Sequence, residues 1–248
     1  MRTCAKTDIG QRRLMNQDFI FVSEEPLGCC PNLFLVADGM GGEKAGDYAS
    51  RFVVERLSAY LKESKIDKPV EALTKGICEV NRQLHKLSME NPDLRGTGTT
   101  LVAAMVLQGT LHVANVGDSR LYLLHKGRLT QITRDHSYVE ELVARGMLVR
   151  GSEAYQAQKN VITRAIGAEN EVRVDFFDES LEEGDLILLC SDGLTNMLTD
   201  EEIRQLLVAD ASLAQKTALL VQRANENGGS DNISVILSQP RIQEVSVC

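Results

Sequence analysis

Four aspartates in this chain lie where an apolar, strand-forming segment meets glycine, serine or asparagine. They are Asp38, Asp118, Asp192 and Asp231. A single aspartate of this kind is most simply a turn residue, because its side chain hydrogen-bonds the neighbouring backbone. Four carboxylates brought together at the ends of buried strands, however, would repel one another unless cations neutralised them. The pattern therefore predicts a fold whose strand ends converge on a metal site.

The expected metal ligands are oxygen atoms. The chain has no Cys-x-x-Cys pair and no His/Cys cluster, and carboxylate ligands alone favour Mg²⁺ or Mn²⁺ over zinc or copper. Two such ions about 3.5–4 Å apart would activate a bridging water and hold a phosphoryl group. The sequence thus predicts a divalent-metal site for phosphoryl transfer or hydrolysis.

A basic pair precedes a polar triplet near the N-terminus. Arg12 and Arg13 are followed by Asn16, Gln17 and Asp18. A guanidinium can bind a dianionic phosphate through two parallel hydrogen bonds, which fixes an orientation that metal ions alone leave open. A solvated basic pair on the surface is the alternative interpretation.

The composition fits one domain, which we expect to cover residues 1–240, followed by a short C-terminal tail, 241–248. The apolar fraction of 43% allows a sizeable core, and the net charge of −8 argues against a nucleic-acid partner. The N-terminal residues form no signal segment, the apolar runs are far shorter than a membrane span, and the six cysteines form no disulfide pattern. We expect a cytoplasmic monomer that does not insert into membranes.

The period of the apolar residues changes along the chain. Strands are expected at 32–37, 99–107, 110–116, 120–124, 129–133, 172–177, 186–190 and 233–238, with tight turns at 108–109 and 126–127. Helices are expected at 43–61, at 69–87, from a Ser137 capping box to Gly146, after a Thr199 capping box, and at 211–226. Segment 38–42 is expected to turn, and 147–159 to be a mobile surface segment. This order indicates a layered α/β sandwich rather than alternating βαβ units.

Eight ordered motifs resemble those of the metal-dependent Ser/Thr protein phosphatases of the 2C type, in the branch typical of bacteria. The first four are Gly-x-x-Arg-x-x-Asn-Gln-Asp at 10–18, Val-Ala-Asp-Gly-Met-Gly-Gly at 36–42, Gly-Thr-Gly-Thr-Thr at 96–100 and Asn-Val-Gly-Asp-Ser-Arg at 115–120. The last four are Asp-His-Ser at 135–137, Ile-Thr-Arg-Ala-Ile-Gly at 162–167, Ser-Asp-Gly-Leu at 191–194 and Ser-Asp-Asn-Ile at 230–233. The resemblance implies two packed, mainly antiparallel sheets flanked by helix pairs, an α-β-β-α sandwich with the metal site at one end between the sheets.

The resemblance also implies roles for individual residues. Arg13 would bind the phosphate, and Asp18 would be an outer-shell carboxylate that orients metal-bound water. Among the implied metal ligands, Asp38 bridges two ions. The first of these ions is also held by Asp192 and Asp231, and the second by the Gly39 carbonyl. Asp118, together with Asp192, holds a weaker third ion.

The implied reaction is hydrolysis of phosphoserine and phosphothreonine on proteins by a metal-activated bridging water, with Mn²⁺ or Mg²⁺ as the cofactor. The implied partners are phosphorylated proteins and a Ser/Thr kinase that the enzyme opposes. Two other hypotheses stay open. An inactive relative would recognise a partner through the same fold, although the loss of aspartates that would mark it is not seen. A metal-dependent hydrolase of small or nucleotide phosphates would differ mainly in its substrate.

Some positions depart from the wider family pattern. Met40 stands where many members have a histidine thought to protonate the leaving oxygen, and a thioether cannot donate a proton. Gln17 replaces a common glutamate, and segment 155–159 lacks the His-Pro pair often found just before the equivalent of Asn160. His136 is expected to make local hydrogen bonds, and a role as the general acid is its alternative.

Overall fold

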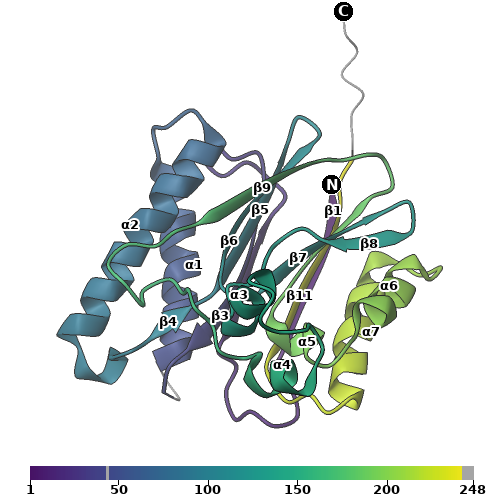
Figure 1. Ribbon diagram of the computed structural model, residues 1–248. Coiled ribbons are helices and arrows are strands. Elements are labelled where there is room, and N and C mark those ends of the chain that lie inside the picture. The colour runs from purple at the N-terminus through teal and green to yellow at the C-terminus, as the bar shows by residue number, and fades with distance from the viewer. Residues whose placement is uncertain (43–44, 242–248) are drawn as a thin grey trace, which may run out of the picture.

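The computed structural model describes residues 1–42 and 45–241, which form two antiparallel sheets packed face to face, each covered on its outer side by a pair of helices (Figure 1). The predicted α-β-β-α sandwich is confirmed. The start of the helix expected at 43–61 and residues 242–248 of the expected tail lie outside the described residues. Within the described ranges, no helix is long and apolar enough to cross a membrane.

The two sheets draw their strands from both halves of the chain. One has the order β2-β3-β5-β6-β9, with β4 paired to β3, and the other has the order β1-β11-β10-β7-β8. The first contains β2 (Asp18–Ser23), β3 (Leu33–Met40), β4 (Gly98–Thr99), β5 (Leu101–Leu107), β6 (Thr110–Val116) and β9 (Asp175–Ser180). The second contains β1 (Arg2–Asp8), β7 (Arg120–His125), β8 (Arg128–Gln131), β10 (Leu186–Cys190) and β11 (Ile233–Gln239).

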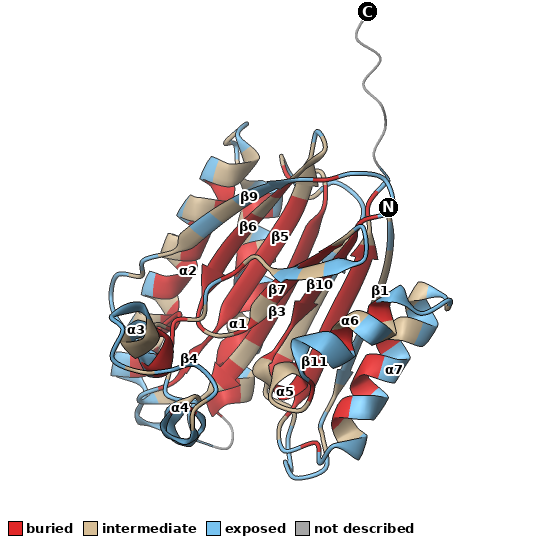
Figure 2. Cartoon of the chain, turned by 45° about the vertical axis from the view of Figure 1, so that its right-hand side comes forward, coloured by how far each residue is buried: buried red, intermediate tan, exposed pale blue. Residues whose placement is uncertain are grey.

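Three apolar layers hold the sandwich together, and the buried strands and inner helix faces stand out in Figure 2. Along β3, Leu33 and Leu35 belong to the layer under helices α1 (Ala45–Glu63) and α2 (Pro69–Glu90), whereas Phe34 and Val36 belong to the layer between the sheets. Side chains alternate between the two faces of a strand, so a strand buried on both faces is a continuous apolar run. Helices α6 (Asp200–Val208) and α7 (Leu213–Glu226) cover the second sheet.

The expected hairpins are confirmed at both turns. Gln108 and Lys126 have φ values of 51° and 48°, and each is followed by a glycine with positive φ. Two successive residues with positive φ match the twist of the flanking strands. The strand expected at 172–177 is instead β9, which begins at Asp175.

The turn expected at 38–42 is wrong in its position, because β3 continues as far as Met40. The main chain there has partners on both sides: Thr100 N donates to Asp38 O (2.9 Å) and Gly39 N donates to Gln17 O (3.0 Å). Only glycine fits in this ladder, since a Cβ at position 39 would lie 1.9 Å from the Gly46 carbonyl oxygen. The extended backbone thus carries Asp38 to the end of the sheet.

Three short helices lie in the second half of the chain: α3 (Tyr138–Ala144) and α4 (Glu153–Gln158) follow β8, and α5 (Asp192–Thr195) follows β10. Ser137 caps α3 as predicted, but the Glu140 carboxylate binds other residues instead of closing the capping box. Thr199 forms the complete capping box predicted for α6. Helix α4 lies within segment 147–159, where no helix was expected.

Candidate metal centre

The four aspartates singled out from the sequence line one pocket of about 260 Å³ between the two sheets. Asp38 comes from the end of β3 in one sheet, whereas Asp192 follows β10 and Asp231 precedes β11 in the other. Asp118 lies in the turn that leads from β6 to β7, and so from one sheet to the other. The lining residues are Arg13, Gln17, Asp38, Gly39, Met40, Gly41, Thr100, Asp118, Asn160, Ile162, Asp192 and Asp231.

Two threonines hold the backbone of Asp38. Its N–H donates to Thr100 Oγ1 (2.9 Å), and its carbonyl accepts from Thr99 Oγ1 (2.9 Å). Both threonines contact Asp38 at its main chain, so neither hydroxyl occupies its carboxylate. Hydrogen bonds to neighbouring strands fix this residue before any ligand binds.

The other sheet presents Asp192 and Asp231 with partly satisfied carboxylates. Asp192 Oδ2 accepts from Asn196 Nδ2, one helical turn later (2.8 Å), while its Oδ1 is buried without a hydrogen-bond partner among the described residues. Asp231 Oδ1 accepts from Asn232 N (2.8 Å), and its Oδ2 accepts from Arg13 Nη2 (2.7 Å). Asp192 therefore has an oxygen that lacks a partner of its own.

Asp18, expected in the outer shell, lies behind the pocket lining. It pairs with Asp38 across the β2–β3 ladder and is buried. Its Oδ2 accepts from Ser191 Oγ (2.7 Å), and its Oδ1, like Asp192 Oδ1, has no partner among the described residues. A buried carboxylate oxygen without a partner is costly, so both oxygens point to a cation or ordered water in this region.

Burial and mutual repulsion raise the pKa values of four carboxyls in this region, those of Asp18, Asp38, Asp118 and Asp192. The removal of water is the largest cause in each case, and the negative charges of neighbouring aspartates add to it for Asp38 and Asp118. The pKa is raised to about 7 for Asp18, about 8 for Asp118 and about 6 for Asp192, and well above the usual value for Asp38. Bound cations would remove the repulsion and favour the ionised forms.

The donor set fits hard divalent cations, although no single ion has a complete cage of side chains. Among the described residues, no group of three or more His, Cys, Asp or Glu side chains is arranged to hold one ion. Ions here would combine carboxylates from separate strands with the Gly39 carbonyl and with water. Such mixed, partly hydrated oxygen ligands are those that Mg²⁺ accepts.

Arg13 lies at the edge of the pocket, where it forms an ion pair with Asp231 (2.7 Å). Its side chain is 49% exposed, so the guanidinium also faces solvent. Arg12 is exposed and does not line the pocket. The structure thus brings Arg13 to the carboxylates and leaves its neighbour outside.

Asn160 and Ile162, at the end of segment 147–162, contribute to the pocket lining. Tyr155 of α4 is buried, and its hydroxyl donates to Glu140 Oε1 (2.7 Å). The Arg150 guanidinium pairs with the same carboxylate. These bonds fasten the segment that lacks the His-Pro pair to the start of α3.

Comparison with known proteins decides the family. The model of the family described as protein phosphatase 2C matches residues 10–238. This chain belongs to the protein phosphatase 2C family. The chain is 42% identical over 236 residues to the Serine/threonine phosphatase stp of Listeria monocytogenes, covering 94% of this chain and 93% of that protein. It is 39% identical over 234 residues to Protein phosphatase PhpP of Streptococcus pneumoniae, covering 93% and 94%.

Solved structures of bacterial family members share the fold of this phosphatase. Stp1 from Staphylococcus aureus matches with a TM-score of 0.89 at 35% identity, over 96% of this chain and 94% of that one. PstP/Ppp from Mycobacterium tuberculosis matches with a TM-score of 0.84 at 34% identity, over 96% and 97%. The protein is therefore a Ser/Thr protein phosphatase of the 2C type, a family that implies divalent metal ions.

Proposed function

We propose that this pocket hydrolyses phosphoserine and phosphothreonine on proteins with two Mn²⁺ or Mg²⁺ ions and a weaker third. The observation that supports this proposal most is that four aspartates from both sheets line one pocket: Asp38, Asp118, Asp192 and Asp231. Their retention argues against an inactive relative that only binds a partner.

Each residue would have a distinct part in the reaction. Asp38 would be shared by two ions, Asp192 and Asp231 would hold the first, the Gly39 carbonyl would complete the second, and Asp118 with Asp192 would hold the third. When bound, the ions supply a water of lowered pKa and neutralise charge on the phosphoryl group. Asp18 would orient water from its position beside Asp38, and Met40, which lines the pocket, has no proton to donate to the leaving oxygen.

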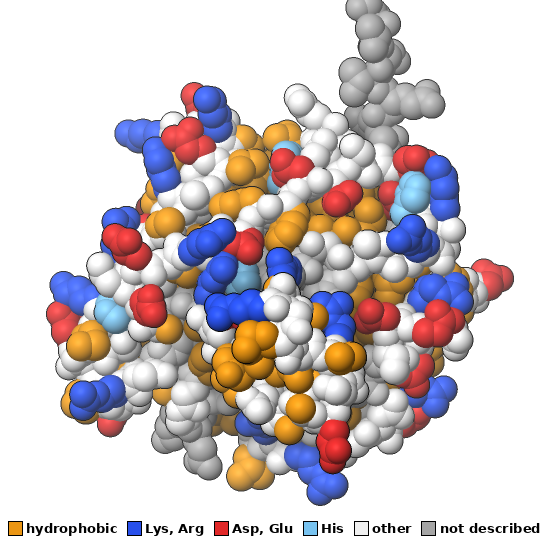
Figure 3. Space-filling model, viewed as in Figure 1, with side chains coloured by type: hydrophobic (Ala, Val, Ile, Leu, Met, Phe, Trp, Pro, Cys, Tyr) orange, Lys and Arg blue, Asp and Glu red, His pale blue; other side chains and the backbone are white. Residues whose placement is uncertain are grey.

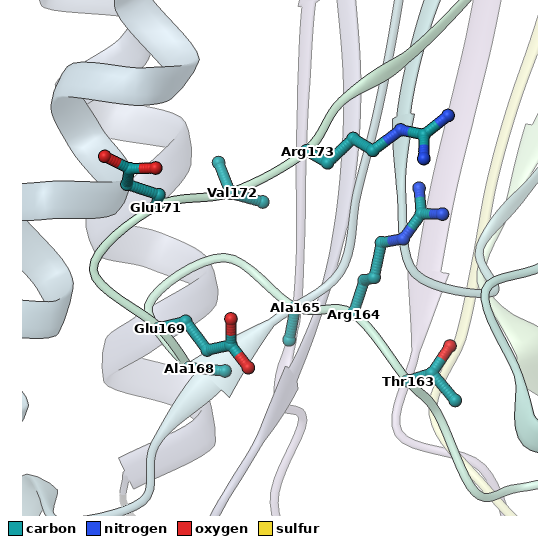
Figure 4. A pocket seen from close by; sticks show the side chains of 8 residues that line it. All are labelled: Thr163, Arg164, Ala165, Ala168, Glu169, Glu171, Val172 and Arg173. Atoms are coloured by element: carbon teal, nitrogen blue, oxygen red, sulfur yellow. The ribbon is translucent and has the colours of Figure 1, made fainter.

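One face of the molecule carries a group of cationic side chains despite the net charge of −8. Figure 3 shows Lys and Arg side chains gathered around a histidine near the middle of one face. A groove of about 410 Å³ contains Arg164 and Arg173, which point to the same side in Figure 4 and both pair with Asp175, together with Glu169 and Glu171. Gly98 lies near both the groove and the pocket, since a Cβ there would lie 3.4 Å from Ala165 Cβ of the groove and 3.8 Å from Met40 Cγ of the pocket. A phosphoprotein is favoured over a small phosphate mainly because the relatives are named as a serine/threonine phosphatase and a protein phosphatase.

Parallel assays test this substrate class. With Mn²⁺ present, we expect kcat/KM for phosphoserine and phosphothreonine peptides to exceed that for nucleotides by roughly ten- to two-hundredfold, since only peptides make contacts beyond the phosphate. Activity on the peptides and on the nucleotides should disappear when EDTA removes the metal ions. A preference for nucleotides would instead support the small-phosphate hydrolase. Comparison of the phosphoproteins in a deletion strain and its parent would test opposition to a Ser/Thr kinase.

Replacing Arg13 with Ala should raise KM for a phosphopeptide and also lower kcat, because the guanidinium both binds and orients the phosphate. One charge-assisted contact contributes roughly 1.5–3 kcal/mol, or about ten- to a hundredfold in kcat/KM. Arg13→Lys should recover only part of this loss, since an ammonium lacks the planar fork. Arg12→Ala is the matched control. A larger loss in Arg12→Ala than in Arg13→Ala would contradict the assignment.

A further inference from the structure

The turn that carries Asp118 is held on one side by a threonine. Thr100 Oγ1 and Ser119 Oγ lie 2.7 Å apart, and both residues are buried. The same Thr100 oxygen accepts the N–H of Asp38. The residue after Asp118 is therefore tied to the strand end that presents another candidate metal ligand.

His136 holds the other side of this turn. Gly117 N donates to His136 Nδ1 (3.1 Å), and His136 N donates to Gly117 O (2.9 Å). Gly117 has a φ of 104°, and a Cβ there would lie 2.6 Å from Thr100 Cγ2, so the turn has room for glycine alone. His136 itself is buried, with 5% exposure. Both the main chain and the ring of His136 thus bind the residue that precedes Asp118.

The other ring nitrogen of His136 faces an ion pair. His136 Nε2 lies 3.1 Å from Asp175 Oδ2, and Arg164 Nη1 donates to Asp175 Oδ1 (2.9 Å). A neutral imidazole has one N–H, and Nδ1 accepts from Gly117, so the proton belongs on Nε2, where Asp175 accepts it. Arg164 Nη1, 3.1 Å from Nε2, opposes a positive charge on the ring. The surroundings therefore select one neutral tautomer.

We propose that His136 is a positioning residue for Asp118: with its proton fixed on Nε2 by Asp175, it accepts the Gly117 N–H through Nδ1 and sets the turn that presents the Asp118 carboxylate. The assignment of Asp118 to the weaker third ion rests on the proposed function, whereas the hydrogen bonds do not. His136 does not line the pocket, and both of its ring nitrogens are engaged. His136 therefore lacks the access to the leaving oxygen that a general acid needs.

The tautomer can be measured without metal or substrate. In the EDTA-treated wild-type enzyme, ¹⁵N NMR of the histidine rings should show His136 protonated on Nε2 alone at neutral pH. Asp175→Ala should mix the two tautomers, whereas Asp175→Glu, which keeps both acceptor oxygens, should retain the original one. A wild-type ring protonated on Nδ1 would overturn the proposal whether or not the enzyme is an active phosphatase.

Two substitutions then separate positioning from packing. Asparagine places its amide oxygen near the position of Nδ1, whereas the amide of glutamine reaches the position of Nε2. By calorimetric titration with Mn²⁺, we expect His136→Gln to weaken the weakest-binding ion by about five- to tenfold and His136→Asn to stay near wild type, since one hydrogen bond is at stake. His112→Asn, at a surface ion pair on β6, is the matched control.

Equal losses of Mn²⁺ affinity in His136→Asn and His136→Gln, with equal loss of thermal stability, would mean that the ring only fills space. Should either histidine variant fail to fold, the two Asp175 variants give the same comparison without touching the ring: Asp175→Ala should weaken the third ion and Asp175→Glu should not. Unchanged Mn²⁺ affinity in Asp175→Ala with mixed tautomers would overturn the coupling to Asp118. Loss of an acid–base limb in the pH–rate profile of His136→Asn, with Mn²⁺ binding intact, would make His136 the general acid instead.

Discussion

Replacing Asp192 or Asp231 with Ala should abolish turnover while leaving the fold intact. Each variant loses a candidate ligand of the ion that activates the nucleophile, and no neighbouring neutral group can replace that charge. Metal activation contributes several kcal/mol to the transition state, so we expect kcat to fall by about a thousandfold or more. The measurement is phosphopeptide hydrolysis at saturating Mn²⁺, together with thermal unfolding in EDTA.

The unfolding curves make this prediction specific. The pKa of Asp192 is raised to about 6 by burial and by the charge of Asp231. Removing one carboxylate therefore relieves repulsion, and the metal-free variants should melt at or above the temperature of the wild type. Asp210→Ala, at an exposed aspartate after α6, is the control and should leave activity unchanged. Near wild-type turnover in Asp192→Ala or Asp231→Ala would contradict the site, and a large loss of stability would assign these residues a structural role.

The convergence of the four aspartates was predictable because their strands carry the signal locally. A continuous apolar run such as 33–37 marks a strand buried on both faces, and an aspartate at its end has few alternatives to a shared polar site. Strand β2 was missed although Phe19-Ile20-Phe21-Val22 is rich in aromatic and β-branched residues, a signal that could have found it. Strand β1 lies at a sheet edge with a mostly exposed pattern, so its sequence has little apolar periodicity.

The residues that support the ligands could not be read from the sequence in the same way. Thr100, Ser191 and His136 contact their partners across 19 to 173 positions, so only the fold brings them together. Asn196 is the exception, since it follows Asp192 by four residues, the spacing of neighbours on one helix face. The bond from Tyr155 to Glu140 likewise depends on a helix that the pattern of 147–159 does not indicate.

The metal-free enzyme should lose stability as the pH rises from 6.5 to 8. A carboxyl whose folded pKa lies above its unfolded value binds more protons in the folded state between the two values, so the free energy of unfolding falls as the pH rises through that window. The pKa of Asp18 is raised to about 7 and that of Asp118 to about 8, from 3.8. Each such proton contributes a slope of about 1.4 kcal/mol per pH unit. The pKa of His136 is lowered from 6.5 by burial, which has the opposite effect, but only below pH 6.5.

Divalent ions should reverse this dependence, because they bind the ionised carboxylates and compete with the protons. Melting temperatures measured from pH 6.5 to 8 should fall in EDTA and hold steady or rise in Mg²⁺, so that the stabilisation by Mg²⁺ grows with pH. Asp118→Asn should flatten the slope in EDTA, since it removes the carboxyl with a pKa of about 8, while Asp178→Asn on exposed β9 should leave it unchanged. Parallel curves with and without Mg²⁺ would mean that the buried carboxyls do not hold the ions. A flat curve in EDTA would mean that these carboxyls are already ionised in the folded protein, and that something other than protons neutralises them.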